Sequence, residues 1–219
     1  MLLYALNAED TTPVSSYEDW VVDKSRSLCK GVYRQPDFSH YAAQNPSGQT
    51  TITADRGEFM VDGPSVFRVN VFLQQPGRQV NADFAKIYRD EKTHRISKVD
   101  AQGHVKIVEP DLRLEGENAQ IDWASDTKTL SPASFRLYKK HARGTASLLF
   151  SKGDDWIELR DATYTTCEPG KDTWVLSAKR VVLNKATGRG VAKHGWLEVK
   201  NIPIFYFPYV DFPIDDRRK

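Results

Sequence analysis

The chain has 219 residues, with 31 Lys and Arg against 29 Asp and Glu, and so a formal net charge of +2. This length suits one large domain or two small ones and is enough to bury a core. The balanced charge gives no field that would favour nucleic acid as a partner, and 40% hydrophobic residues argue against a disordered chain. The longest aromatic and apolar run, residues 202–210, is too short for a membrane-spanning helix.

The first 27 residues are expected to form an N-terminal extension that is weakly structured or contains a short helix. The helix is suggested by apolar residues at helical spacing between Tyr17 and Leu28, with Trp20 and Val21 on the same face. The apolar residues 1–8 lack a basic leader and are short for the core of a signal peptide.

The rest of the chain has the pattern of short antiparallel strands. Turn sequences rich in Gly, Pro, Asn and Asp recur along it, and apolar residues alternate with polar ones between them. Phe67, Val69 and Val71 are expected on one face of a strand, with Arg68 and Asn70 on the other. The pattern predicts an all-β fold with little helix.

An internal repeat interrupts this alternation. A small residue is followed by further small or apolar residues three and five positions later, and the pattern starts at Ala54, Ala82, Gly116 and Ala178, with a degenerate copy at Ala146. A flat strand does not place residues i and i+3 on one face, so each repeat predicts a bulge or bend. Repeats of this kind favour a stacked or rolled array of two-stranded units.

Three segments carry a more specific signal. They are the Cys-Lys-Gly-Val-Tyr sequence at residues 29–33, the segment 162–170 around Cys167, and the aromatic and proline-rich segment 203–219 with its Asp-Asp-Arg-Arg sequence. With the repeats between them, they resemble the periplasmic N-terminal domain of the lipopolysaccharide-assembly (organic-solvent-tolerance) family of Gram-negative outer membranes. The resemblance covers residues 28–219.

The resemblance implies an open, V-shaped β-jelly roll over residues 28–201 and a connector over residues 202–219 to a transmembrane β-barrel that this sequence lacks. It implies a non-enzymatic lipopolysaccharide transporter at the periplasmic face of the outer membrane, without a cofactor and without a nucleic-acid partner. A periplasmic bridge protein would dock by strand addition near Val32–Met60, and the barrel with its plug lipoprotein would receive the lipid. A soluble bridge protein of the same pathway and a glycan-binding or glycan-cleaving jelly roll are the alternatives.

The lipid groove is expected to be lined by the inward faces of two splayed sheets. Alternation alone fits a packed sandwich core as well, and the resemblance favours the groove. The expected lining residues are Ile52, Phe59, Val61, Phe67, Val69, Val71, Val105, Ile107, Leu114, Ile121, Phe135 and Leu137.

The end of the chain is expected to face the barrel and the membrane surface. Its aromatic residues suit an interfacial belt, although a packed terminal strand explains them as well; they are Phe205, Tyr206, Phe207, Tyr209 and Phe212. The resemblance also implies that Cys29 and Cys167 each bridge to a cysteine of the missing barrel. The two are therefore expected not to be bonded to each other here.

No catalytic or metal site is predicted. The five histidines are scattered, two cysteines add little, and no serine lies in a nucleophile-elbow sequence. The basic run from Lys139 to Arg143 is interpreted as a solvated turn, with contact to lipid phosphates as the alternative.

Overall fold

The computed structural model describes residues 19–23, 29, 31–36, 50–60, 63–93 and 95–214. The described chain is built of strands, and it contains no helix able to cross a membrane. The strands are β1 (Trp20–Val21), β2 (Val32–Tyr33), β3 (Thr51–Thr53), β4 (Arg56–Glu58), β5 (Ser65–Gln75), β6 (Arg78–Arg89), β7 (Ile96–Glu109), β8 (Leu112–Asp122), β9 (Thr127–Leu137), β10 (Ala142–Ala146), β11 (Leu148–Lys152), β12 (Trp156–Tyr164), β13 (Trp174–Asn184), β14 (Arg189–Val199) and β15 (Ile202–Pro213).

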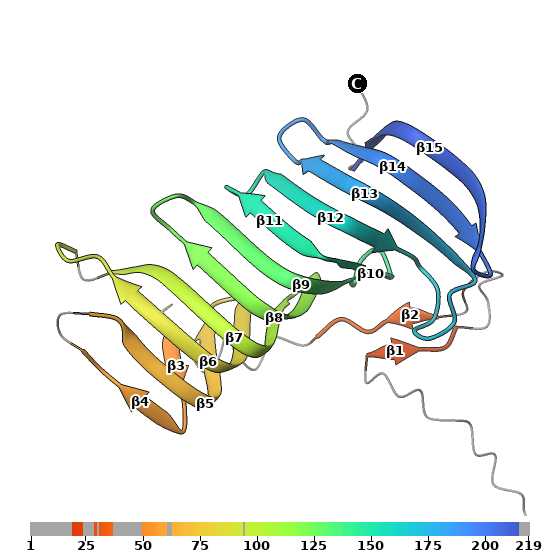
Figure 1. Ribbon diagram of the computed structural model, residues 1–219. Helices are drawn as coiled ribbons and strands as arrows, with labels where there is room; N and C mark the ends of the chain where they lie inside the picture. The colour runs from red at the N-terminus through yellow and green to blue at the C-terminus, as the bar shows by residue number, and fades with distance from the viewer. Residues whose placement is uncertain are drawn as a thin grey trace, which may run out of the picture.

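Strands β3 to β15 form one antiparallel sheet of 13 strands, which runs in the order β15-β14-β13-β12-β11-β9-β8-β7-β6-β5-β3 (Figure 1). Strand β4 also pairs with β5, and β10 pairs with β9 beside β11. The sheet does not close on itself, so β3 and β4 lie at one end and β15 at the other. Strands β1 and β2 form a separate hairpin. The all-β prediction is confirmed.

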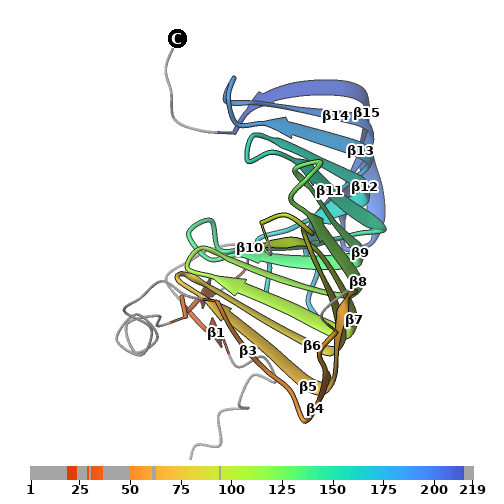
Figure 2. The same ribbon diagram turned by 90° about the vertical axis from the view of Figure 1, so that its left-hand side faces the viewer.

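Every long strand bends at a matching position, and this common line divides the sheet into two walls (Figure 2). The pairing of β5 with β6 skips residues 69–70 and 83, that of β7 with β8 skips 103–104 and 117, and that of β13 with β14 skips 179 and 194. The first wall is the side of this line that contains Phe67, Leu130 and Leu159. The second wall is the side that contains Val71, Phe135 and Ala162. The folded sheet is the open, V-shaped jelly roll that the resemblance implied.

The bends occur where the repeats were found in the sequence. The pairing between Ala82 and Ala85, between Gly116 and Ala119, and between Ala178 and Val181 is interrupted each time by one unpaired residue. The prediction of a bend is therefore confirmed for these three repeats. The leading residue is small because side chains on the inner side of a sharp bend crowd together: a Cβ at Gly116 would overlap the Pro132 carbonyl and the Leu130 side chain.

Polar residues occupy most positions on the outer side of the bends, and Val69, with a φ of 64°, lies beside Asn70 there. Asn70, His104, Asp161 and His194 all have positive φ angles, between 44° and 52°. Asn, Asp and His tolerate this left-handed conformation better than most residues because their side chains can form local hydrogen bonds. The side chain of Asn70, for example, donates to the Asp55 carboxylate at 2.8 Å.

The structure corrects two expectations about local structure. Trp20 and Val21 form strand β1 rather than part of a helix, and the flanking residues 17–18 and 24–28 lie outside the described chain. Val69 does not share a face with Phe67 and Val71, because the bend falls at residues 69–70 and leaves Val69 46% exposed. Residues 202–213, which belong to the expected connector, form β15, and β15 pairs with β14.

Candidate functional site

The inner face of the first wall carries one apolar row that crosses the whole sheet. Neighbouring strands pair these residues directly, so their side chains lie side by side on the same face. In order from β5 to β15, without β10, the row is Phe67, Ala85, Ala101, Ala119, Leu130, Leu149, Leu159, Val181, Ala192 and Val210. No polar side chain interrupts it.

The second wall carries a matching row over its first half. Ile52 of β3 is paired with Leu73, and the row continues through Val80, Ile107, Leu114 and Phe135 of β9. The same face of β12 to β15 carries a corresponding row, composed of Tyr164, Leu176, Leu197 and Phe205. Side chains next to the bend are buried, and those farther from it are mostly half-buried.

The two walls touch each other in the stretch formed by strands β5 to β8. Leu73, Val80 and Ile107 of the second wall and Ala119 and Ile121 of the first surround a hollow of only about 30 Å³. That volume is about the share of one water molecule, so this stretch is nearly packed. Phe59, which follows β4, is 73% exposed with its ring centroid 5.2 Å from that of Phe67, so an exposed aromatic side chain adjoins this packed end.

At the other end, the inner face of β14 and β15 remains open. Phe205 is 60% exposed and lies on this face, as do Phe207 and Phe212. Gly195 and Gly190 leave the room that the rings of Phe207 and Phe212 occupy, because a Cβ at either glycine would overlap the ring. The exposed apolar surface therefore increases towards β15.

The aromatic residues of β15 divide between the two faces of the strand. Tyr206 and Tyr209 lie on the outer face, where the Tyr206 ring centroid is 4.5 Å from that of Trp196. The Tyr206 hydroxyl is 2.9 Å from Nδ1 of His194, at the outer bend. Only part of the expected aromatic belt therefore faces the groove.

Most of the residues expected to line the groove occupy inner-face positions. These are Ile52, Phe67, Val71, Val105, Ile107, Leu114, Ile121, Phe135 and Leu137. Val69 lies in the bend, and Val61 lies outside the described residues. The sequence analysis did not predict four further inner-face residues, Leu149, Leu159, Val181 and Leu197. Identifying them requires the register of strand pairing, which the repeat indicates only in part.

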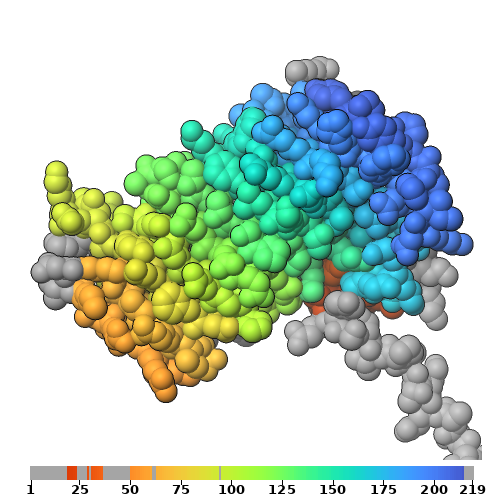
Figure 3. Space-filling model, in the orientation of Figure 1, coloured from red at the N-terminus to blue at the C-terminus, as the bar shows by residue number. Residues whose placement is uncertain are grey.

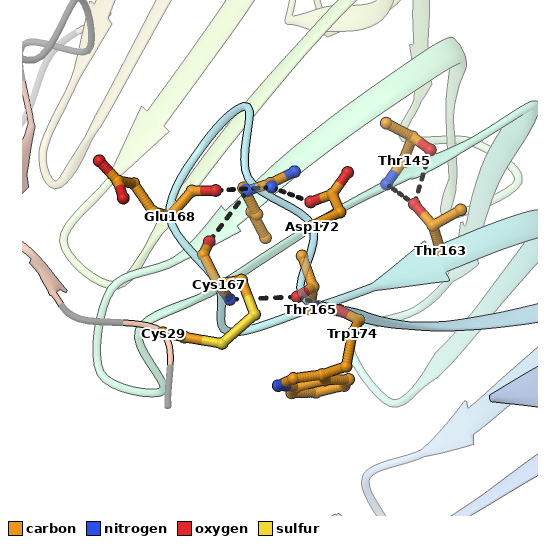
Figure 4. A network of polar contacts seen from close by, with 9 residues as sticks. Cys29, Thr145, Thr163, Thr165, Cys167, Glu168, Asp172 and Trp174 are labelled. Atoms are coloured by element: carbon orange, nitrogen blue, oxygen red, sulfur yellow. Dashed lines mark hydrogen bonds and ion pairs between the residues drawn. A yellow bond between two sulfur atoms is a disulfide. The ribbon is translucent and has the colours of Figure 1, made fainter. Parts of the chain in front are cut away.

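The structure contradicts the expected state of the cysteines. Cys29 and Cys167 form a disulfide with each other, with a Cα–Cα distance of 4.2 Å (Figure 4). Cys167 is fully buried in the loop between β12 and β13, where its backbone N–H donates to the Thr165 hydroxyl at 3.1 Å. The expectation rested on the resemblance, which implied other partners for both cysteines; the folded sheet brings Cys29 next to this loop although 138 residues separate the two cysteines in sequence.

The hairpin β1–β2 packs against outward-facing residues of the second wall. Trp20, Tyr33 and Tyr138 form a small buried aromatic cluster. Beside it, Arg136 Nη1 donates to both oxygens of Asp19, at 2.8 and 2.9 Å, and the Tyr138 hydroxyl donates to Asp19 at 3.2 Å. Tight packing is needed here, because a Cβ at Gly31 would overlap the Trp20 indole.

This environment shifts two pKa values. Burial and, next, the negative charge of Asp19 raise the pKa of Tyr138 from 10.0 to about 12. Burial alone would lower the pKa of Arg136, but the hydrogen bond and the charge of Asp19 outweigh it and the pKa is raised. Both groups therefore keep their protons at neutral pH, and the contact joins a carboxylate to a guanidinium.

The basic run 139–143 makes contacts within the fold. Lys139 forms an exposed ion pair with Asp111 at 2.6 Å. The Arg143 guanidinium donates to the carbonyl groups of Cys167 and Glu168, at 3.3 and 3.1 Å, and pairs with Asp172. Arg143 thus holds the loop that carries the disulfide.

The outer side of the bend has a separate hollow of about 730 Å³ beside His104, Glu117, Ser147 and Asp161. The hydrogen bond that His104 Nδ1 donates to the Asp83 carboxylate, at 2.7 Å, and the charge of that carboxylate raise the pKa of the exposed His104. Within the described ranges, no three His, Cys, Asp or Glu side chains come together as they would to hold a metal ion.

A model of the LptA/LptD N-terminal domain family, described as an LPS transport protein family, matches residues 51–146. The LPS-assembly protein LptD of Hahella chejuensis is 35% identical over 200 residues, which is 87% of this chain and 24% of that protein. The LptD proteins of Coxiella burnetii and Acinetobacter baumannii are also 35% identical, over 88% and 89% of this chain.

The chain spans about a quarter of the length of these curated LptD relatives, which fits an N-terminal portion of an LptD protein. Among solved structures, LptH of Pseudomonas aeruginosa, an LptA homologue, aligns with a TM-score of 0.41 and 15% identity over 48% of this chain and 76% of that one. That likeness is too low to support the fold, which rests on the sheet described above.

Proposed function

We propose that this chain is the periplasmic conduit of an outer-membrane lipopolysaccharide-assembly protein and that it carries the acyl chains of lipopolysaccharide along the inner face of its folded sheet. It acts without catalysis. The observation that carries the proposal is the apolar row of the first wall, which passes through ten strands without a polar residue. The family of residues 51–146 supports the choice of lipid.

The physical requirement is to keep hydrocarbon away from water. Each methylene that leaves an apolar surface for water costs about 0.8 kcal/mol, so about ten methylenes cost roughly 8 kcal/mol. A chain that slides along a continuous apolar row exchanges one contact for the next and avoids most of that cost. The half-buried side chains of this row, such as Leu149 and Val181, offer such contacts.

The two ends of the sheet suggest where the neighbours bind. Strands β3 and β4 pair only with β5 within the described chain, so their outer edges can accept a strand from a periplasmic bridge protein. The open, aromatic end at β15 would pass the lipid to a transmembrane barrel and its plug lipoprotein. This order places uptake at the packed end and delivery at the open end.

Site-specific photo-crosslinking to lipopolysaccharide tests the proposal with well-matched pairs. Leu149 and Val181 face the groove, while their neighbours Phe150 and Val182 are also apolar and half-buried but face outward. A photo-reactive residue at position 149 or 181 should capture lipopolysaccharide at least about fivefold more than one at 150 or 182. Equal labelling of both faces would reject the groove, and turnover of a polysaccharide would favour a glycan-cleaving protein.

A further inference from the structure

A second row on the inner face of the first wall contains a single charged residue. Each of its members lies two residues farther from the bend than a member of the apolar row, so the two rows face the same side. In order from β5 to β15, without β10, the second row is Ser65, Ile87, Val99, Ile121, Lys128, Ser151, Ile157, Leu183, Gly190 and Phe212. Lys128 of β9 and Ser151 of β11 are direct neighbours in it, on strands that lie side by side (Figure 1).

The strand pairing places the Lys128 side chain inside the groove. Lys128 pairs with Ile121 of β8, and Ile121 lines the hollow of about 30 Å³ between the two walls. Directly paired side chains of antiparallel strands lie on one face, with their Cβ atoms about 5 Å apart. Lys128 therefore lies on the first strand beyond the packed stretch formed by β5 to β8.

The protein neutralises the charge of Lys128 only weakly. Its Nζ donates to Oδ1 of Asp154 at 3.3 Å, in the turn between β11 and β12, and the Asp154 side chain is 95% exposed. An ion pair with so exposed a carboxylate is weak, because water screens it and both side chains lose freedom in forming it. The Ser151 hydroxyl beside it has no hydrogen-bond partner among the described residues. A cation and a free hydroxyl thus lie next to each other in an otherwise apolar part of the groove.

We propose that Lys128 and Ser151 bind a phosphate group of the lipid that the groove carries. The proposal rests on the proposed function and names the part of the lipid that this position recognises. The ammonium and the hydroxyl both donate hydrogen bonds, and phosphate oxygens accept them. The positive charge of Lys128 favours an anion over the neutral hydroxyl groups of a sugar.

A phosphate bound here determines where the acyl chains lie. Leu130 and Leu149 belong to the apolar row and are about 7 Å from Lys128 and Ser151 along their strands. Acyl chains attached near the phosphate can therefore reach the apolar row directly and continue along it. The phosphate itself stays near the mouth of the groove, where the Lys128 side chain is 32% exposed.

Capture of lipid by the purified chain tests this phosphate site. The probes are fluorescent lipid A with its phosphates and the same lipid after their removal, each supplied in detergent micelles. The unmodified chain should bind the phosphorylated lipid about fivefold more tightly, and Lys128→Met should abolish this preference without weakening capture of the phosphate-free lipid. Lys128→Arg keeps the charge and should keep most of the preference. Lys193→Met is the matched control, because Lys193 follows Ala192 of the apolar row and therefore faces outward.

The outcomes separate the phosphate site from the groove. Capture of both lipids with no preference in the unmodified chain, or an equal preference in Lys128→Met, would overturn the phosphate site and leave the groove in place. Replacing chloride by inorganic phosphate at equal ionic strength should leave the preference unchanged. Its loss there would assign the site to the free ion and overturn the proposal. If the unmodified chain captures neither lipid, the proposed function fails and the phosphate site fails with it.

Discussion

Small residues set how closely the two walls approach at the bend. Gly116 faces the Pro132 carbonyl and Leu130, so a methyl group at position 116 has no space. We expect Gly116→Ala to lower the free energy of unfolding by about 1–3 kcal/mol in urea denaturation. Gly57→Ala is the control, because its methyl group would meet Phe67 at an ordinary 3.4 Å. Equal stability of the two variants would show that the bend is not tightly packed.

The buried phenol of Tyr138 predicts a loss of stability at high pH. Its pKa is about 12 in the folded chain and 10.0 when unperturbed, so above pH 10 the unfolded chain loses this proton while the folded chain keeps it. Stability contributed by Tyr138 is complete below pH 10 and should fall between pH 10 and 12, by up to roughly 2–3 kcal/mol. Urea denaturation at several pH values measures this fall, and a Tyr138→Phe variant should lack it. The same fall in the variant would assign it to another group.

Individual residues show why part of the site was predictable. Phe67 and Leu114 could be placed on the inner face because alternation within one strand is readable from the sequence. Val69 was misplaced because the bend falls at that residue, and the repeat predicted a bend in each unit without giving its position in β5. The disulfide between Cys29 and Cys167 was not predicted because the resemblance implied barrel partners for both cysteines, and the sequence does not show how a distant hairpin packs.

The strand bends should depend on residues that tolerate positive φ angles. Asn70 has a φ of 52° and donates a hydrogen bond to Asp55. Asn70→Val should cost about 1–2 kcal/mol of unfolding free energy, because a β-branched residue is strained in this conformation. Asn70→Gly, which loses the same hydrogen bond but accepts the angle, separates the two effects. A glycine variant as unstable as the valine variant would assign the cost to the hydrogen bond.

Among the elements, the long strands were more predictable than the short ones. The repeats at Ala82, Gly116 and Ala178 predicted bent strands at the positions of β6, β8 and β13. The hairpin β1–β2 was not foreseen, since the apolar spacing around Trp20 also fits a helix. Its strands have two residues each and are held by tertiary contacts with Arg136 and Tyr138, which local sequence does not reveal.

At the scale of the molecule, the folded sheet combines a packed end with an open end. Buried core clusters include residues from β5 to β12, while Phe205 and Val210 of β15 are exposed. The space-filling view, in the orientation of Figure 1, shows the strands of the sheet as one continuous body (Figure 3). A single sheet of this kind can present one apolar surface along its whole length, as a carrier of hydrocarbon chains requires.

The most direct test of the proposed carrier role is to map where a bound acyl chain lies. A lipid A analogue with a nitroxide at the end of one acyl chain, added to the isotopically labelled chain, broadens the NMR signals of nearby methyl groups. We expect broadening of inner-face methyls such as those of Leu149, Val181 and Leu197, with the outward-facing Val182 unaffected. Broadening of Val182 equal to that of Val181, or no broadening on the inner face, would contradict the groove.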